Sequence, residues 1–429
     1  MEKKKAYVLG LSVIAVLLAA IPIALILLKC SKIFFIFFGS DTTLIIGVMA
    51  WLVHEKRRNN EPTVRQQDLL INSSFIMNVA RIPVEFTYDE IDKATKTFSQ
   101  LIGQGSSASV FKGVLENGKS VAVKALSGER GEVEFRSEVA AIASAQHVNL
   151  VRLLGFCKDN ETRKFIVYEY IPNGSLASWI FNNKGNNGAF LTWPLRYKIV
   201  VEVAKALSYL HHDCHAKVLH LDLKPENILL DQNFRAVVSD FGLSMIMGSG
   251  ESRVWTNIRG TRGYFAPEWL QENGISEKSD VYSFGMVLLE VMSGRRNICL
   301  SLEGDEGWKR KIDYFPATAV RLAMEGRYSE LVDKALMDVG EEIKESEVKT
   351  LCCVALMCIQ ERDDSRPTMT NVVDMLEGRV TVWEPQMIGP HMFTVEDDAV
   401  LTLPLNQVAH FGFTNALSSS FTVSIVSAR

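Results

Sequence analysis

The sequence has little net charge, no internal repeat and no cysteine framework. It carries 46 Lys and Arg against 50 Asp and Glu, a formal net charge of −4, so composition gives no sign of nucleic acid as a partner. Its seven cysteines are an odd number without pairing periodicity, which argues against a short disulfide scaffold and suits a reducing compartment. The remaining composition is that of a globular protein. The 429 residues suffice for one large two-lobed domain or two domains, with extra segments.

Two long runs near the N-terminus contain almost no charge. Residues 6–28 form a run of 23 uncharged residues, which is long enough to cross a bilayer core at about 1.5 Å per residue. A second run, 33–53, contains one charged residue, Asp41. A carboxylate near mid-membrane costs roughly 2.5–3.5 kcal/mol, so the second run is the weaker predicted span.

Three arrangements of this membrane segment (1–53) compete: a cleaved signal peptide, a single span, or a hairpin of two spans. Basic residues lie before the first run (Lys3–Lys5) and after the second (Lys56–Arg58). Both sets favour the cytosolic side of a membrane. Only two spans, or cleavage of the first run, satisfy both, and either arrangement leaves the rest of the chain in the cytosol.

Past the membrane segment, the chain changes pattern twice. Residues 54–85 are mostly polar and suit a juxtamembrane linker, and from Phe86 the pattern is globular. Strand-like runs at 101–115, 120–127, 150–157 and 165–171 surround one helical run at 132–147. That helix places Phe135, Val139 and Ile142 on one face. The region 86–170 is therefore predicted to be a small sheet with one inserted helix.

From residue 171 to 380 the pattern is mainly helical. One helix, 194–212, has an apolar face made of Ile199, Val203, Ala206 and Leu210. A second begins at a predicted cap, Ser279, and ends at Gly294. A third, 347–360, carries Cys352, Cys353 and Cys358, which we expect in the core. The tail 381–429 shows no clear period and receives no predicted structure.

Two glycines open the stretch "GQGSSASV", Gly103–Val110, between strand-like runs. Glycine lets backbone amides approach a phosphate closely. Taken alone, the stretch could equally be a hairpin turn, because Ala108 stands where a third glycine of the pattern would be. It is not a dinucleotide fingerprint, since a strand and not a helix follows it.

The strand "VAVK" places Lys124 among apolar neighbours, where a buried charge needs a partner. Glu138, on the inner face of the following helix, can be that partner. The alternative is a lysine that is exposed on the surface.

A dense polar cluster lies in "VLHLDLKPENILLD", residues 218–231. Asp222 can accept a proton from a hydroxyl, Lys224 can neutralise phosphate charge, and Asn227 can bind a metal through its carbonyl oxygen. Asp240, in "SDFGLS", adds a second hard oxygen ligand. This set suits Mg²⁺ held largely by nucleotide phosphates and not a closed protein cage.

In order along the chain stand "GQGSSASV", "VAVK", Glu138, "HLDLKPEN", "DFG" (240–242), "APE" (266–268), "SDVYSFG" and "DSRP" (364–367). This ordered set resembles the eukaryotic protein kinase domain over Phe86 to Leu376. The resemblance implies an α+β, bilobal fold with a small β-sheet N-lobe, one helix in it, and a larger helical C-lobe. It also implies ATP and Mg²⁺ as cofactors, with Mn²⁺ as the alternative metal, and proteins as substrates.

Finer features narrow the resemblance. Lys224 together with "GTRGYFAPEW" resembles serine/threonine kinases, and "FTYDEIDKATKTFS" and "VYEYIPNGSL" resemble plant receptor-like kinases. "LHLDLKPENILLD" with "YFPATAVRLAMEGR" is similar to the S-locus (G-type) lectin group. In that group a lectin ectodomain precedes the membrane span, and we expect none within these 429 residues.

The resemblance implies roles residue by residue. Asp222 would be the catalytic base, Lys224 a γ-phosphate contact, Lys124 the phosphate-binding lysine and Glu138 its partner. Asn227 and Asp240 would hold the metal, and Tyr168 would be the gatekeeper. The ATP contacts would be Ile102, Gly103, Gln104, Gly105, Val110, Ala122, Lys124, Glu169, Ile171 and Leu229. Glu268, Asp280 and Arg366 would be structural, with Glu268 and Arg366 pairing to hold the end of the activation segment.

One departure from the pattern affects regulation. Leu221 stands where an arginine usually precedes the catalytic aspartate, and leucine cannot pair with a phosphate on the activation segment. The phosphorylation candidates there are Ser249, Ser252, Thr256 and Thr261. We expect Arg253 and Arg259 to be exposed and to offer only screened pairing. Phosphorylation at the first three sites should therefore matter little, whereas Thr261 should face the substrate.

These expectations give a membrane-anchored serine/threonine kinase in receptor-type signalling, placed at the plasma membrane with its kinase domain in the cytosol. A co-receptor or a second copy of the chain would be its partner. The alternative is a pseudokinase or truncated receptor that acts as a binding partner. Intact Lys124, Asp222, Asn227 and Asp240 argue against that alternative.

Overall fold

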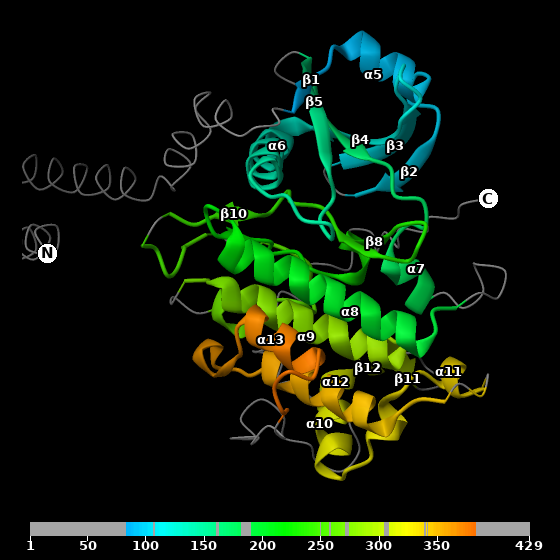
Figure 1. Ribbon diagram of the computed structural model, residues 1–429, viewed down its shortest axis with the longest axis vertical. Helices are drawn as coiled ribbons and strands as arrows, with labels where there is room; N and C mark the ends of the chain where they lie inside the picture. Colours follow the sequence, from blue (N-terminus) through cyan, green and yellow to red (C-terminus); the bar gives the residue numbers. More distant parts are fainter. Residues whose placement is uncertain are drawn as a thin grey trace, which may run out of the picture. The chain divides into compact units, whose positions relative to one another are not determined.

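The computed structural model describes residues 83–105, 108–159, 163–181, 190–248, 250–256, 259–270, 274–303, 309–338, 340 and 342–382 (Figure 1). The predicted membrane runs 6–28 and 33–53, the linker up to residue 82 and the tail from residue 383 lie outside these residues. Within the described part, no helix combines the length and the apolar composition that crossing a membrane requires.

The N-lobe is built on a six-stranded sheet with the order β1-β5-β6-β4-β3-β2. Strand β1 runs parallel to β5, and the other neighbours are antiparallel. The strands are β1 (Val84–Glu85), β2 (Leu101–Gln104), β3 (Ala108–Val114), β4 (Ser120–Ser127), β5 (Leu153–Asp159) and β6 (Arg163–Glu169). The sheet thus begins at Val84, two residues before the predicted start of the lobe.

Alternation along β4 explains the two faces of this sheet. Val121 and Val123 are fully buried in an apolar cluster with Ile91. Ala122 and Lys124 point the other way, because successive strand residues face opposite sides. The sequence pattern therefore places a lysine on the inner face of the sheet, opposite a helix.

Two helices accompany the sheet. Helix α5 (Tyr88–Thr95) begins with a capping box, in which the Thr87 hydroxyl accepts from the Glu90 amide and Glu90 accepts from the Thr87 amide. Helix α6 (Gly128–Ala143) lies against β4, β5 and β6 (Figure 1). Its predicted inner face is confirmed, since Phe135, Val139 and Ile142 are all at most 6 % exposed.

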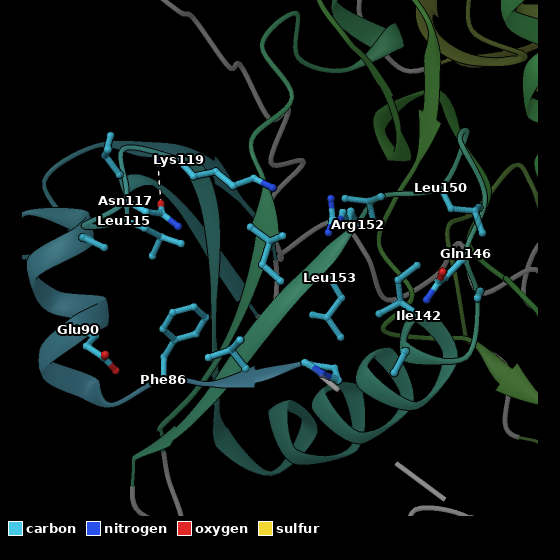
Figure 2. A pocket seen from close by; sticks show the side chains of 18 of the residues that line it. Phe86, Glu90, Leu115, Asn117, Lys119, Ile142, Gln146, Leu150, Arg152 and Leu153 are labelled. Carbon is cyan, nitrogen blue, oxygen red and sulfur yellow. Dashed lines mark hydrogen bonds between the residues drawn. The ribbon is translucent and has the colours of Figure 1, made fainter. Parts of the chain in front are cut away.

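A cavity of about 1030 Å³ opens on the N-lobe and is bounded by three segments. Phe86 and Glu90 come from β1–α5, Asn117 from the β3–β4 turn, Gln146 from the segment after α6, and Leu153 from the start of β5 (Figure 2). None of the residues predicted to bind ATP or metal lines it. This cavity is therefore separate from the candidate active site.

The C-lobe is mainly helical, as predicted. Its helices are α7 (Leu176–Ile180), α8 (Trp193–Ser208) with a π-helical turn (Tyr209–Asp213), α9 (Glu277–Ser293), α10 (Phe315–Met324), α11 (Lys334–Asp338), α12 (Glu345–Cys358) and α13 (Met369–Leu376). Single 3₁₀ turns cover Pro225–Asn227, Pro267–Leu270, Tyr328–Leu331 and Asp363–Ser365.

Three short antiparallel strand pairs complete the C-lobe: β7 (Val218–Leu219) with β10 (Met245–Ile246), β8 (Ile228–Leu230) with β9 (Ala236–Val238), and β11 (Ile298–Glu303) with β12 (Lys309–Tyr314). The first two pairs flank the polar cluster at 220–227. They fix both ends of the loop that carries Asp222.

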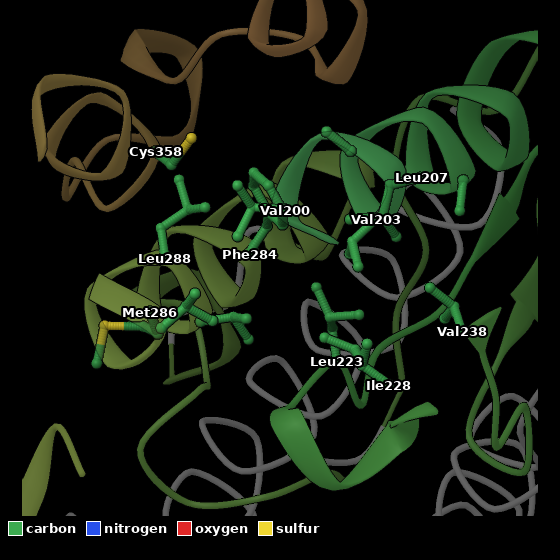
Figure 3. Packing of buried hydrophobic residues seen from close by; sticks show 14 of the residues in the cluster. Val200, Val203, Leu207, Leu223, Ile228, Val238, Phe284, Met286, Leu288 and Cys358 are labelled. Carbon is green, nitrogen blue, oxygen red and sulfur yellow. The ribbon is translucent and has the colours of Figure 1, made fainter. Parts of the chain in front are cut away.

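Helix α9 is the buried centre of the C-lobe. Phe284 and Leu288 from α9 pack with Val200 of α8 and Cys358 of α12 (Figure 3). A Cβ on Gly285 would lie 2.7 Å from the Cβ of Cys358, so glycine is what lets α9 and α12 approach this closely. The predicted core positions of Cys352, Cys353 and Cys358 are confirmed, as is the apolar face of α8 at Ile199, Val203, Ala206 and Leu210.

The predicted N-cap of α9 was wrong. The helix begins at Glu277, and the cap is Ser276, whose hydroxyl accepts from the Lys278 amide at 3.2 Å. Ser279 instead donates its hydroxyl to Glu268 at 2.8 Å. Both serines suit a cap by sequence, and the buried carboxylate of Glu268 decides between them.

Candidate active site

A buried ion-pair network connects the two lobes. Lys124 Nζ lies 2.7 Å from Glu138 Oε2 on α6 and 2.7 Å from Asp240 Oδ1 in the C-lobe. The Tyr168 hydroxyl also donates to Glu138 Oε1. Strand β4 and helix α6 therefore bring Lys124 and Glu138 together, with the Glu138 side chain completely buried.

The electrostatics of this network favour its charged form. Burial alone would lower the pKa of Lys124, but the carboxylates of Asp240 and Glu138 outweigh it and raise that pKa above its usual value. Burial alone would also raise the pKa of Asp240, yet Lys124, with Lys224 and His220, lowers it to about 2. Asp240 is therefore a carboxylate at any physiological pH, as a metal ligand must be.

The loop after β7 joins Asp222, Lys224 and Thr261 in a closed triangle of hydrogen bonds. Thr261 Oγ1 donates to Asp222 Oδ1 at 2.7 Å, and Lys224 Nζ donates to Asp222 Oδ2 at 2.8 Å and to Thr261 Oγ1 at 2.6 Å. A hydroxyl thus already lies within proton-transfer distance of the Asp222 carboxylate. Sequence distance hid this contact, because Thr261 is 39 residues away.

Asn227 and Asp240 are the residues with spare oxygen atoms for a metal. The Asn227 amide nitrogen donates to Asp222 O at 2.8 Å and to Asp222 Oδ2 at 3.1 Å, which leaves its carbonyl oxygen as the acceptor. Asp240 is held in the left-handed region at φ 66°. No group of three or more His, Cys, Asp or Glu that could hold a metal occurs in the described ranges. A hard cation here would take further ligands from water and phosphate, which fits Mg²⁺.

The glycine-rich strand has no internal need for its glycines. A Cβ on Gly103 would make ordinary contact with Val110 at 3.6 Å, and a Cβ on Gly105 would meet only Ala108 O at 3.7 Å. Gly103 pairs with Val110 across β2 and β3, beside Ile102 and Gln104. Glycine that its own fold does not demand is typical of a backbone that another molecule approaches closely.

The remaining residues predicted to contact ATP come from both lobes. Ala122 pairs with Tyr168 across β4 and β6, and Glu169 ends β6. Leu229 lies in β8. Ala122, Ile171 and Leu229 are partly buried against the core. These apolar surfaces suit a flat aromatic ring such as adenine.

Leu221 is held in a strained conformation beneath this site. Its φ is 65°, which is uncommon for a residue with a branched side chain. Asp280 of α9 compensates by accepting the amides of His220 at 2.8 Å and Leu221 at 2.7 Å, and it also contacts His211 Nε2 at 2.8 Å. Burial alone would raise the pKa of Asp280, but these partners lower it.

The Leu221 side chain, 6 % exposed, belongs to the core cluster and lies close to Thr261, Phe265 and Trp269. The predicted activation segment therefore rests here on apolar contacts. An arginine at this position would bring a charge into that apolar setting.

The prediction that Arg253 is exposed was wrong. Its guanidinium is half-buried, forms an ion pair with Asp363 at 2.6 Å and donates to Gly274 O at 3.2 Å. The neighbouring Val254 forms a β-bridge with Ile275. These contacts order the segment without a phosphate. They join positions about 20 and 110 residues apart, which no local sequence pattern indicates.

The phosphorylation candidates differ in exposure. Ser252 is exposed, Thr256 is half-buried, and Thr261 is half-buried against Asp222. Ser249 lies outside the described residues. Arg259 is exposed, as expected.

Glu268 and Arg366 form a buried, bidentate ion pair. Arg366 Nη1 lies 2.9 Å from Glu268 Oε1, and Nη2 lies 2.8 Å from Oε2. Both side chains are at most 5 % exposed. The structure thus joins the end of the predicted activation segment to the loop before α13.

Comparison with known proteins agrees with this geometry. Residues 97–376 match the family model described as protein kinase domain. The chain belongs to the protein kinase family. It is also 49 % identical over 419 residues to a probable receptor-like protein kinase of Arabidopsis thaliana, covering 94 % of this chain and 92 % of that relative.

Other relatives of this kinase carry lectin names, as the sequence analysis predicted. A G-type lectin S-receptor-like serine/threonine-protein kinase of Arabidopsis thaliana is 44 % identical over 73 % of the chain, and one of Oryza sativa subsp. japonica is 40 % identical over 70 %. The kinase spans only 37 % and 36 % of the length of these two relatives. The similarity therefore covers little more than a third of each of them.

The sequence analysis missed several residues that surround the kinase site. The Tyr168 contact to Glu138, the His211 contact to Asp280 and the Arg296 contact to Glu226 all bridge distant parts of the chain. A polar residue within an otherwise apolar strand or helix was the one available signal, and it names no partner.

Proposed function

We propose that this kinase transfers the γ-phosphate of ATP to serine and threonine hydroxyls of proteins, in receptor-type signalling. The observation that carries the proposal is the triangle of Asp222, Lys224 and Thr261. It holds a carboxylate, an ammonium group and an aliphatic hydroxyl within 2.8 Å of one another. A substrate hydroxyl needs the same two partners, one to take its proton and one to offset phosphate charge.

The contacts support a role for each of these residues. Asp222 accepts the proton of the attacking hydroxyl, and Lys224 faces the transferred phosphoryl group. Lys124, fixed by Glu138, binds phosphate oxygens with a charge that burial does not neutralise. Asn227 and Asp240 would hold the metal, Mg²⁺ with Mn²⁺ as the alternative, which would supply positive charge to offset that of the phosphate oxygens.

The nucleotide is bound between the lobes. The backbone of Gly103 to Gly105 covers the phosphates, with Ile102, Gln104 and Val110 around them. Ala122 and Leu229 enclose the adenine, and Glu169 and Ile171 offer the hinge backbone. A Cβ on Gly103 or Gly105 would make only ordinary contacts within the chain, so the fold itself does not require glycine there. This supports the role of the two glycines in approaching the phosphates.

The structural roles rest on buried contacts. Glu268 and Arg366 fix the end of the activation segment, and Asp280 holds the backbone before Asp222. We assign Ser249, Ser252 and Thr256 as phosphorylation sites with little influence on activity. Leu221 and the Arg253 ion pair with Asp363 support this assignment.

We further propose that residues 1–53 anchor the kinase in the plasma membrane and that 54–85 link them to a cytosolic kinase domain, with lobes at 86–170 and 171–380 and a tail from 381. The apolar runs and their basic flanks support this topology. A co-receptor or a second copy of the chain is the expected partner. Protease protection in sealed microsomes tests it, and a shielded kinase domain would contradict it.

The phosphotransfer proposal is tested with the purified full chain, Mg²⁺ and radiolabelled ATP. We expect phosphate on serine and threonine, and not on tyrosine, of peptide substrates. Asp240→Asn should abolish transfer while the melting temperature stays close to wild type, because the exposed edge of Asp240 tolerates an amide. Equal rates for wild type and variant would refute the proposal and favour a binding role.

A further inference from the structure

A single arginine bridges two carboxylates beside the catalytic loop. The Arg296 guanidinium forms an ion pair with Glu226 Oε1, and its Nη1 lies 4.0 Å from Glu290 Oε2. Nη1 also donates to the Tyr264 hydroxyl at 3.1 Å. The guanidinium carbon lies 3.8 Å from the centre of the Phe181 ring. Four side chains therefore hold Arg296 in one place.

This cluster adjoins the position of the attacking hydroxyl. Glu226 stands two residues after Lys224 and four after Asp222 on the same loop. Tyr264 stands three residues after Thr261, whose hydroxyl contacts Asp222. A substrate chain that places a hydroxyl at Asp222 continues past this surface at about 3.3 Å per residue. One of its neighbouring side chains will meet the cluster.

The cluster is open to solvent on one side and closed on the other. The side chains of Arg296 and Glu226 are 39 % and 32 % exposed, whereas Glu290 is 2 % exposed. Glu290 accepts from the Tyr264 hydroxyl at 2.7 Å and from the Asn297 amide at 3.0 Å. A substrate side chain can therefore reach Arg296 and Glu226, but Glu290 lies behind them.

Acidic side chains outnumber basic ones in this cluster. Two carboxylates face one guanidinium, and the buried Glu226 Oε2 and Asn297 Oδ1 have no hydrogen-bond partner among the described residues. Without Arg296 the surface would be an acidic pocket backed by an aromatic ring. Such a pocket selects an arginine or lysine side chain. The chain fills it with an arginine of its own.

We propose that Arg296 determines substrate specificity by occupying this acidic pocket from within the chain. A substrate arginine or lysine at the neighbouring position would meet the Arg296 charge instead of a free carboxylate. The kinase therefore takes protein substrates with an uncharged residue there. This inference rests on the proposed phosphotransfer and names the residue that sets its peptide preference.

Peptides with one threonine acceptor and a single arginine placed at each flanking position test the inference. For the wild-type full chain, arginine should give no gain in kcat/KM over alanine at any position. Arg296→Ala should gain at least tenfold for arginine at one position, mainly through a lower KM. The double variant Arg296→Ala, Glu226→Gln should lose that gain, and 300 mM salt should reduce it.

Two further variants serve as controls. Arg296→Lys should keep the wild-type preference, because it still fills the pocket with a positive charge. Arg295→Ala removes the neighbouring arginine, whose partner Asp313 lies outside the cluster, and should leave the preference unchanged. If Arg296→Ala does not fold, Arg296→Gln carries the test, because it keeps most of the side chain and loses the charge.

The outcomes separate the two proposals. A wild-type kinase that already favours arginine at one position, and loses that preference on Glu226→Gln, overturns the inference. The inference is also overturned if Arg296→Ala or Arg296→Gln loses rate equally on every peptide. Either result leaves phosphotransfer intact, whereas a wild-type chain that phosphorylates no peptide refutes the proposed function itself.

Discussion

The buried pair of Glu268 and Arg366 offers the sharpest test of how this kinase holds its activation segment. Arg366 donates two hydrogen bonds to Glu268. It donates three more to main-chain oxygens of Gln360, Lys278 and Glu361, at 2.7, 2.9 and 3.1 Å. Arg366→Met would leave the Glu268 carboxylate buried without its counter-charge. It would also remove the guanidinium donors to three main-chain oxygens.

Removing one partner of a buried ion pair costs about 3–5 kcal/mol. In a domain of this size each kcal/mol lowers the melting temperature by about 2 °C, so we expect a fall of roughly 6–10 °C. Glu268→Gln and the double variant complete a double-mutant cycle, which should give a coupling energy of about 2 kcal/mol. Phosphotransfer should fall in both single variants, because the end of the activation segment loses its anchor.

Thermal unfolding followed by circular dichroism measures the cycle. Arg362→Met is the matched control, because its ion pair with Asp364 is 78 % and 59 % exposed and should contribute less than about 1 kcal/mol. The reasoning would be refuted if the losses of stability in the two single variants simply added in the double variant. It would also be refuted if Arg366→Met lowered the melting temperature no more than Arg362→Met does.

Three further predictions concern the site and its surroundings. Thr261→Val should lower kcat by about a hundredfold with little change in the KM for ATP; an unchanged kcat would contradict the hydrogen-bond triangle. The triple variant Ser249→Ala, Ser252→Ala, Thr256→Ala should lose less than about tenfold in rate, since surface phosphate pairs contribute little; a loss of about a hundredfold would mean that the segment is gated by phosphate. Burial raises the pKa of Glu290 from 4.5 to about 7. Protonated Glu290 therefore stabilises the fold fully below about pH 4.5, and roughly 3 kcal/mol of the free energy of unfolding is lost as the pH rises through 7. Glu290→Gln should remove this slope from chemical-denaturation data, and equal slopes in both proteins would contradict it.

Local pattern was enough for the parts of the site built from adjacent elements. Alternation along β4 turns Lys124 inward, and the face of α6 that carries Val139 also carries Glu138. Because a strand and the next helix pack together, their inward charges meet. Sequence therefore indicates this pair without any knowledge of distant contacts.

Contacts between distant loops could not be read in the same way. Arg253 was expected to be exposed because it lies in a loop, yet Asp363, 110 residues away, lies within 2.6 Å. The Thr261 contact to Asp222 likewise depends on how the activation segment folds over the catalytic loop. Such contacts are decided by tertiary packing and leave no period in the sequence.

The first residues of helices could be predicted only in part from local sequence. The capping box of Thr87 and Glu90 was a local signal for α5 that the sequence analysis did not use. At α9 two serines competed for the cap, and Glu268, in the 3₁₀ turn before the helix, bound one of them. A local rule named the candidates, and a tertiary contact chose between them.

The central claim is that Asp222 takes the proton from a serine or threonine hydroxyl. The most direct measurement compares Asp222→Asn with wild type for peptide phosphorylation and for MgATP affinity, with the exposed Asp338→Asn as the matched control. We predict a loss of kcat of about a thousandfold with MgATP affinity within about threefold of wild type, and no change in the control. Asp222→Asn with wild-type kcat would contradict the claim.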